Sequence, residues 1–186
     1  MLIIGITGTL GAGKGTIVEY LAGEQGFVHY SVRAWLLEEI RRRGLPGNRD
    51  SMFKLANDLR AANGPSYVTD QLFNQARESG KNCIIESIRT PGEITSLRQK
   101  GPFVLFAVDA DPRIRYERIL KRQSETDRIS FETFLANEAR ETGTTDPNKQ
   151  NLSACMKQAD YLFLNNSTRA ELFTAVSSAL SEINGK

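Results

Sequence analysis

The stretch Gly8-Thr9-Leu10-Gly11-Ala12-Gly13-Lys14-Gly15-Thr16 decides how this chain folds. It follows an apolar run at residues 2–6 (L-I-I-G-I) and precedes a helical pattern at residues 17–21 (I-V-E-Y-L). A strand, a glycine-rich turn and a helix, in that order, let consecutive backbone N–H groups point at one anion. The helix start adds its own unpaired N–H groups and the positive end of its dipole. The stretch therefore predicts a phosphate-binding loop.

The spacing from Gly8 to Lys14 matches G-x-x-x-x-G-K, the pattern of loops that bind nucleoside triphosphates. Lys14 is expected to contact the β- and γ-phosphates. Gly15 stands where a Ser or Thr usually binds Mg²⁺, and Thr16 supplies a hydroxyl one position later. The residues expected to bind ATP are Gly8, Leu10, Gly11, Ala12, Gly13, Lys14, Gly15 and Thr16. The loop thus predicts ATP with Mg²⁺ as the bound cofactors.

Composition limits the classes of partner. The 186 residues include 24 basic and 22 acidic side chains, a net charge of +2, which predicts no broad nucleic-acid surface. No apolar run approaches the ~20 residues of a membrane helix, and the first residues lack the features of a signal peptide. Cys83 and Cys155 lie too far apart in the sequence for a metal motif, and His29 is interpreted as a packing residue. We expect a cytoplasmic protein, monomeric or homodimeric, that binds neither nucleic acid nor membrane.

Short apolar runs alternate with longer amphipathic stretches along the chain. The runs at 2–6, 27–30, 82–85, 103–108 and 161–164 are expected to be strands. The helical patterns fall at 14–24, 32–43, 51–62, 66–78, 91–100, 112–122 and 169–183. This alternation predicts an α/β fold: a three-layer, doubly wound, five-stranded parallel sheet in a single domain, 1–186. Within it we expect an acceptor-side helical segment at about 31–80 and a small lid at about 118–150, with irregular segments at 41–50 and 124–150.

A carboxylate and an arginine follow the third expected strand, in the segment I-I-E-S-I-R-T at residues 84–90. If this strand neighbours the first one, Glu86 lies beside the phosphate loop, where it can hold the water shell of Mg²⁺ or accept a proton. Together with Thr16, Glu86 is the expected metal contact. Arg89 would stand at the edge of the sheet and clamp a phosphate bidentately.

A basic helix follows the fourth expected strand. Arg115, Arg118 and Arg122 recur at i, i+3 and i+7 and so share one helix face. Such a face is either solvated or part of a lid, where cations stabilise the charge of a phosphoryl group in transfer. Arg128 and Arg140 are weaker candidates for the same role.

These motifs resemble those of adenylate kinases and related nucleoside monophosphate kinases. The loop reads G-x-G-K-G-T, Glu86 to Thr90 matches the acid, arginine and threonine of D-G-x-P-R-[ST] but not its glycine and proline, and Y-E-R-I-L-K-R resembles the R-x-x-x-R of the lid. The resemblance implies that Arg118 lies near the adenine and phosphates and Arg122 on the transferring phosphoryl group. It also implies that Lys14, Arg89, Arg118 and Arg122 are catalytic.

The acceptor side is less defined. Ser31 fits the Ser/Thr of the monophosphate kinases, but Leu37 replaces their arginine, and Arg33 either substitutes for that cation or only begins a helix. We expect Ser31, Arg33 and Arg89 to bind the acceptor. Residues 159–167 (A-D-Y-L-F-L-N-N-S) resemble the closing motif of dephospho-CoA kinases, although the acidic pair of those enzymes is missing after the second strand.

The sequence as a whole predicts a phosphotransferase that moves the γ-phosphoryl group of ATP to a small nucleotide-like acceptor. The favoured acceptor is a (deoxy)nucleoside monophosphate. The alternatives are a dephospho-CoA kinase-like enzyme and an ATPase or regulatory nucleotide-binding protein that lacks a small acceptor. A GTPase is disfavoured, because residues 148–151 (N-K-Q-N) lack the carboxylate of the guanine motif N-K-x-D.

Overall fold

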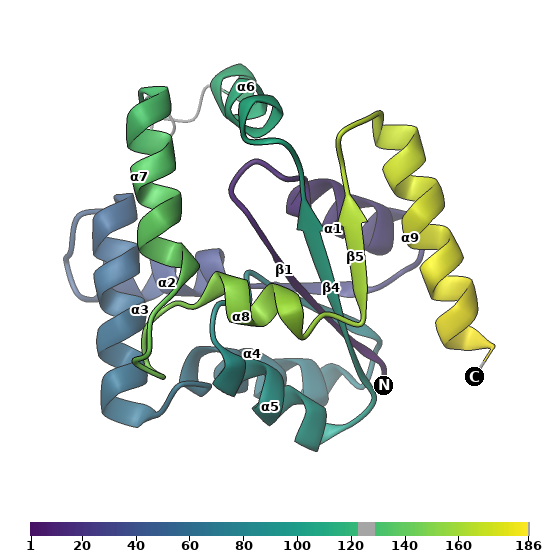
Figure 1. The fold of residues 1–186 in the computed structure, drawn as a ribbon. Coiled ribbons are helices and arrows are strands. Elements are labelled where there is room, and N and C mark those ends of the chain that lie inside the picture. Colours follow the sequence, from purple (N-terminus) through teal and green to yellow (C-terminus); the bar gives the residue numbers. More distant parts are fainter. Residues whose placement is uncertain (123–128, 186) are drawn as a thin grey trace.

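A computed structural model describes residues 1–122 and 129–185, and it places five parallel strands in one sheet (Figure 1). The strands follow the spatial order β2-β3-β1-β4-β5. Their bounds are β1 Ile3–Gly8, β2 Val28–Ser31, β3 Cys83–Glu86, β4 Phe103–Asp109 and β5 Tyr161–Leu164. Every strand pairing is parallel, as the alternation of short apolar runs with helices predicts.

Helices cover both faces of this sheet (Figure 1). They are α1 Lys14–Gly23, α2 Val32–Arg42, α3 Arg49–Asn63, α4 Tyr67–Ser79, α5 Pro91–Lys100, α6 Pro112–Arg122, α7 Phe131–Thr142, α8 Leu152–Lys157 and α9 Arg169–Asn184. One apolar cluster joins α1 and α9 to the sheet, and a second joins α2, α3, α4 and α5 to it from the other face. The predicted three-layer, doubly wound α/β fold is confirmed. In the part of the chain that is described, no helix is long and apolar enough to span a membrane.

The strand order places β3 beside β1, with Glu86 opposite Ile6 in the register. The chain leaves β1 for β2, on one side, whereas it leaves β3 for β4, on the other. Ligands of doubly wound folds bind at such a switch point, outside the carboxyl ends of the strands. The phosphate loop and the Glu86–Arg89 segment therefore meet at one edge of the sheet, as the sequence predicts for neighbouring strands.

The segment after α6 differs from its expected irregular course. Residues 131–142 form the helix α7, whose Ser130 cap accepts a hydrogen bond from the Thr133 amide, and residues 152–157 form the short helix α8. The large apolar residues of α7, Phe131, Phe134 and Leu135, span only about one turn, and Phe134 is the one of them that is buried, so the apolar stripe is short. The expectation of an irregular segment is thus wrong for residues 131–142.

Candidate active site

The phosphate loop owes its shape to close packing as well as to its glycines. Gly13 has φ 115°, and a Cβ atom there would lie 2.4 Å from Nδ2 of Asn165. Gly11 has φ 79°, and a Cβ atom would lie 2.5 Å from the Arg115 carbonyl oxygen. Both positions combine a left-handed backbone with a neighbour that leaves no room for a side chain. The glycines therefore seat the loop against α6 and the segment after β5.

Lys14 lies at the start of α1 and faces the loop. Its Nζ donates hydrogen bonds to the carbonyl oxygens of Gly8, at 2.8 Å, and Thr9, at 2.9 Å. Burial, and next the positive charge of Arg89, lower the pKa of Lys14 to about 7, although Glu86 and Glu141 act in the opposite direction. An anion that enters the loop is therefore expected to raise the pKa of Lys14 and restore its full positive charge.

Nucleotide binding is therefore expected to take up a proton at alkaline pH. At pH 8.5 the free protein holds Lys14 mostly neutral, because its pKa is about 7, and the phosphates of bound ADP raise that pKa. Uptake of about one proton is expected at pH 8.5 and much less at pH 6, where the ammonium already exists. Calorimetric titration with ADP in buffers of different ionisation enthalpy measures this number. Equal uptake at both pH values would contradict the assignment to Lys14.

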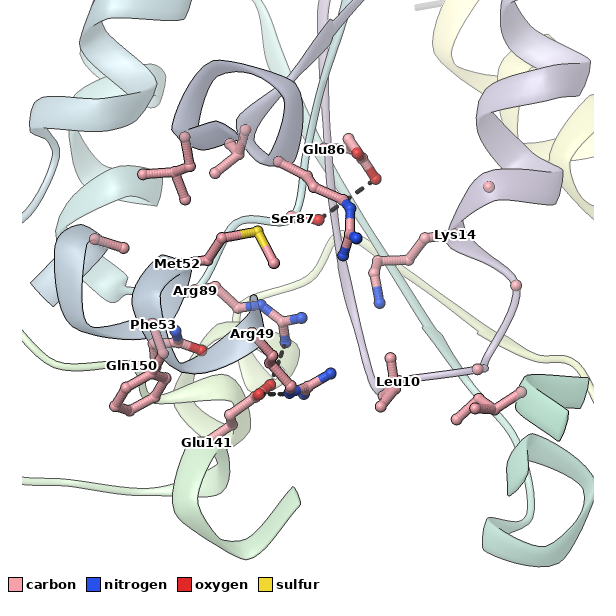
Figure 2. Close-up of a pocket in the computed structure, with 18 of the residues that line it drawn as sticks. Leu10, Lys14, Arg49, Met52, Phe53, Glu86, Ser87, Arg89, Glu141 and Gln150 are labelled. Carbon is pink, nitrogen blue, oxygen red and sulfur yellow. Dashed lines mark hydrogen bonds and ion pairs between the residues drawn. The ribbon is translucent and has the colours of Figure 1, made fainter. Parts of the chain in front are cut away.

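Glu86 lies beside Lys14 at the carboxyl end of β3 (Figure 2). The Ser31 hydroxyl donates to its Oε1 at 3.0 Å, and Nε2 of His29 lies 3.7 Å from the same oxygen. Burial alone would raise the pKa of Glu86, but the contacts with His29 and Ser31 and the charge of Lys14 outweigh it and lower that pKa. His29 thus lies against this carboxylate, whereas the sequence suggested a packing residue at the end of the strand.

The residues present fit a magnesium ion that a nucleotide carries. The described residues contain no group of three His, Cys, Asp or Glu side chains able to hold a metal by themselves. Thr16 and the ionised Glu86 line the same cavity as the loop, and both offer the oxygen ligands that Mg²⁺ prefers. These two residues remain the predicted contacts of the ion and its waters.

Ser87, which follows Glu86, is the one non-glycine residue with positive φ (65°) in the described ranges 1–122 and 129–185. A left-handed conformation costs a serine about 1–2 kcal/mol. Replacement by glycine removes that strain but adds unfolded-state entropy, so Ser87→Gly is expected to stabilise the fold by up to about 1 kcal/mol. Urea denaturation measures the difference. A loss of stability would show that the hydroxyl, 3.4 Å from Glu86, outweighs the strain.

Two arginines and a carboxylate meet on the opposite wall of the cavity. Arg89 lies after β3, Arg49 at the start of α3, and Glu141 near the end of α7 (Figure 2). Glu141 forms ion pairs with Arg49 and, at 3.5 Å, with Arg89. Burial would raise the pKa of Glu141, but the charges of Arg89 and Arg49 outweigh it and keep this pKa below its ordinary value. The site thus contains an ionised carboxylate that the sequence analysis did not identify.

A buried ion pair between Glu93 and Arg60 fixes the backbone of Arg89. The carboxylate of Glu93, in α5, accepts from the Arg89 backbone amide at 2.6 Å and from the Thr90 amide at 2.9 Å. Its other oxygen accepts from Nη2 of Arg60 at 3.0 Å, and the two side chains are 1% and 0% exposed. Glu93 therefore fixes the turn from which the Arg89 side chain enters the cavity.

The arginines of α6 divide into two roles. Arg115 is 3% exposed and lies behind the phosphate loop, where Nε donates to the Ala110 carbonyl at 2.7 Å. Its Nη2 forms an ion pair with Glu138 of α7 at 2.9 Å. Arg118 and Arg122 line the cavity instead. Of the three arginines predicted to share one helix face, Arg115 supports the fold, whereas Arg118 and Arg122 face the cavity.

Of the two weaker lid candidates, Arg128 and Arg140, the structure describes only Arg140. Arg140 lies over the ring of Phe53, 4.5 Å from its centroid, and forms an ion pair with Asp50 at 3.2 Å. Arg128 lies outside the described residues. Arg140 therefore joins α7 to α3 at the margin of the cavity.

The motif near the carboxyl end of the chain supports the loop. Asn165 donates from Nδ2 to the Ala12 carbonyl oxygen at 2.7 Å, in buried surroundings. Asp160 accepts from the Leu105 amide at 2.7 Å and so ties β5 to β4. These two residues of the motif therefore support the loop and the sheet.

One cavity of about 830 Å³ joins the phosphate loop to Glu86 and to the cluster of Arg49, Arg89 and Glu141. Six loop residues line it, namely Leu10, Gly11, Gly13, Lys14, Gly15 and Thr16. Its other polar lining includes Glu86, Arg33, Arg89, Arg118 and Arg122, and its apolar wall consists of Val32, Leu36, Met52, Phe53 and Ala56. Gly8, Ala12 and Ser31 stand behind this lining: Gly8 accepts from Lys14, Ala12 accepts from Asn165, and Ser31 donates to Glu86. The roles assigned to all these residues from the sequence stay predictions.

Three residues that line the cavity are not among the site residues expected from the sequence, namely Arg49, Glu141 and Gln150, although the polar segment around Arg49 was considered for contact with a base or ribose. Each stands on or beside a helix whose position depends on tertiary contacts. One signal was available: Asn48 precedes Arg49 and caps α3 by accepting from the Ser51 amide at 2.9 Å, so the start of that helix, with Arg49 on it, was predictable. Nothing in the local sequence distinguishes Glu141 from an exposed helical glutamate.

The family comparisons agree with this geometry. A family model described as an AAA domain matches residues 4–146. The UPF0200 protein of Thermococcus sibiricus is 32% identical over 172 residues, which cover 89% of this chain and 87% of that protein.

Solved kinase structures share the fold. The gluconokinase from Sinorhizobium meliloti has a TM-score of 0.60 at 15% identity and covers 98% of this chain and 93% of its own. The shikimate kinase from Bacteroides thetaiotaomicron has a TM-score of 0.58 at 14% identity and covers 98% of both chains. The phosphate loop, the strand order and the likeness to these kinases show that the fold is of the P-loop kinase type. The chain contains an AAA domain and belongs to the UPF0200 family.

Proposed function

We propose that this protein transfers the γ-phosphoryl group of ATP to a small phosphate-bearing acceptor, a (deoxy)nucleoside monophosphate. The observation that carries the proposal is the single cavity, which joins the phosphate loop to a second half lined by arginines and apolar side chains. Hydrolysis of ATP alone requires no such half. An apolar wall suits a nucleobase, and arginines suit a phosphate.

The charges in the cavity favour an acceptor that is already anionic. A hydroxyl acceptor benefits from a general base with a pKa near the working pH. Glu86 and Glu141 both have lowered pKa values, which makes them weak bases. A phosphate oxygen needs no base, because it is an anionic nucleophile as it stands. The favoured chemistry is therefore transfer from phosphate to phosphate.

The proposed roles follow from position. The loop and Lys14 hold the donor phosphates, Arg118 and Arg122 lie over the transferring group, and Arg89 holds the acceptor phosphate, with Arg33 at the mouth of the cavity. Thr16 and Glu86 would contact Mg²⁺ through its waters, and the ion supplies charge neutralisation on the β- and γ-phosphates when bound. Closure over the reactants excludes water and so suppresses hydrolysis.

An acceptor screen tests the proposal. The protein is incubated with ATP, Mg²⁺ and one of the ribo- or deoxyribonucleoside monophosphates or dephospho-CoA, and ³¹P NMR follows the products. Conversion of a monophosphate to its diphosphate, in step with ADP formation, supports the proposal. A new 3′-phosphate on dephospho-CoA, or phosphate release that no acceptor stimulates, contradicts it and supports the corresponding alternative.

A further inference from the structure

The arginine pair on the acceptor side of the cavity already holds an anion that belongs to this chain. Glu141 bridges Arg49 and Arg89, and Figure 2 shows its carboxylate at the edge of the cavity beside both guanidinium groups. Its side chain is 8% exposed, so water screens these ion pairs weakly. A buried carboxylate thus occupies the position where the acceptor's phosphate is expected.

Arg49 and Arg89 have hydrogen-bond donors that Glu141 does not use fully. Nε of Arg49 is buried without a hydrogen-bond partner among the described residues. Nη1 of Arg89 reaches the carboxylate only at 3.5 Å and the Gly8 carbonyl only at 3.4 Å, both beyond a short charge-assisted bond. Two guanidinium groups can donate more hydrogen bonds than one carboxylate accepts here.

A phosphate monoester fits this capacity better than a carboxylate does. It presents three acceptor oxygens and a charge between about −1.5 and −2 at neutral pH. A phosphodiester carries a single negative charge, as Glu141 does, and a hydroxyl carries none. An incoming anion must also overcome the repulsion of Glu141 or displace it from both arginines.

We propose that Arg49 and Arg89 together bind the terminal phosphate of the acceptor, and that Glu141 is an internal competitor that restricts this subsite to phosphate monoesters. The inference rests on the proposed function, because it places the acceptor in this half of the cavity. Displacement requires only that the side chain of Glu141 turn away, since Glu138, one helical turn earlier in α7, remains paired with Arg115 at 2.9 Å.

The opposite role makes the opposite prediction. A carboxylate that positions the two guanidinium groups for the acceptor would improve binding, and its removal would weaken every ligand of this subsite. A carboxylate that competes with the ligand weakens binding, and its removal strengthens every anionic ligand of this subsite. The sign of the effect therefore separates the two roles.

Two small probe molecules allow this test without any assumption about the nucleobase of the acceptor. Phenyl phosphate is a dianionic monoester, methyl phenyl phosphate is its monoanionic diester, and the phenyl ring suits the apolar wall. Calorimetric titration of each probe is carried out with the loop filled by the ATP analogue AMP-PNP and Mg²⁺. The proteins compared are the wild type, Glu141→Gln and the control Asp50→Asn. Asp50 has the same charge and also lies near the end of α7, but its side chain is 83% exposed and does not line the cavity.

The wild type is expected to bind phenyl phosphate and to reject the diester. Glu141→Gln should bind both probes at least about tenfold more tightly than the wild type, so that binding of the diester becomes measurable, because a like charge has been removed from the subsite. Asp50→Asn should behave as the wild type. Unchanged or weaker binding of the diester in Glu141→Gln overturns the proposal, as does an equal gain in Asp50→Asn.

A second variant keeps the test decisive if Glu141→Gln does not fold. Arg49→Gln should weaken phenyl phosphate at least about tenfold and leave AMP-PNP binding unchanged. Unchanged phenyl phosphate binding in this variant contradicts the assignment. These readouts are equilibrium binding, so they are separate from turnover: an acceptor screen without any product refutes the proposed kinase activity, whereas the probe titrations refute or support the subsite.

Discussion

Replacement of Lys14 by methionine is expected to lower phosphoryl transfer by about 10³-fold or more. The Lys14 ammonium is the cation that the phosphate loop itself supplies, and it stands 2.8 Å from the Gly8 carbonyl at the mouth of that loop. Methionine fills a similar volume but offers no charge to the β- and γ-phosphates. The loss falls on the transition state, where charge on the transferring group is redistributed.

The measurement is turnover of ATP with the acceptor found in the screen, for Lys14→Met and for the control Lys54→Met. Lys54 carries the same substitution on α3, but its side chain is 78% exposed and pairs with Asp58 of the same helix, so activity should persist. The fold should also persist in Lys14→Met. Burial lowers the pKa of Lys14 to about 7, so below that pH the buried ammonium disfavours folding, and its removal should not lower Tm at pH 6. Turnover close to that of the wild type would refute the donor site.

Replacement of Glu93 by glutamine is expected to destabilise the fold by about 3 kcal/mol or more. Glu93 is 0% exposed and compensates the charge of Arg60, which is 1% exposed. Glutamine has the same shape but no charge, so the guanidinium of Arg60 is left buried without a counter-ion. The amide also lacks one of the two acceptor oxygens that receive the backbone amides of Arg89 and Thr90 and the side chain of Arg60.

Glu171→Gln is the matched control for this prediction. Glu171 occupies the same third position of a helix, behind the Thr168 cap of α9, but it is exposed. Its replacement should cost less than about 1 kcal/mol. Urea denaturation followed by circular dichroism measures both variants. If the two changes cost the same, water that enters from the cavity solvates Arg60, and Glu93 is not its essential partner.

The fold followed from local patterns, because each element carries its own signal. Five short apolar runs and every described helix except α7 and α8 were predicted, and each strand bound lies within two residues of its expected position. Thr90 and Glu93 form the capping box that begins α5, with Pro91 as its first residue, and such a start is visible in the sequence. The loop at residues 8–16 was predictable for the same reason: its shape depends on its own glycines and flanking elements.

The site was predictable only in its donor half. Glu86 is the last residue of β3, and Lys14 and Arg89 follow β1 and β3 within a few residues, so the strand order brings the three together. Arg49 and Glu141 lie 92 positions apart and meet only because α7 packs across α3. The α7 sequence lacks a broad apolar face, and ion pairs such as Glu138–Arg115 help to fix its place. Such contacts depend on side chains far along the chain, which no local pattern encodes.

By itself the sequence determined the doubly wound sheet and predicted a phosphate-binding, glycine-rich loop at its edge. Backbone geometry and hydrophobic periodicity act over a few residues, and both can be read directly. Only the tertiary structure decided what faces that loop: an apolar wall, an arginine pair and the carboxylate that lies between them. Those groups come from α2, α3, α7 and the end of β3, and long-range packing rather than local conformation places them around one cavity.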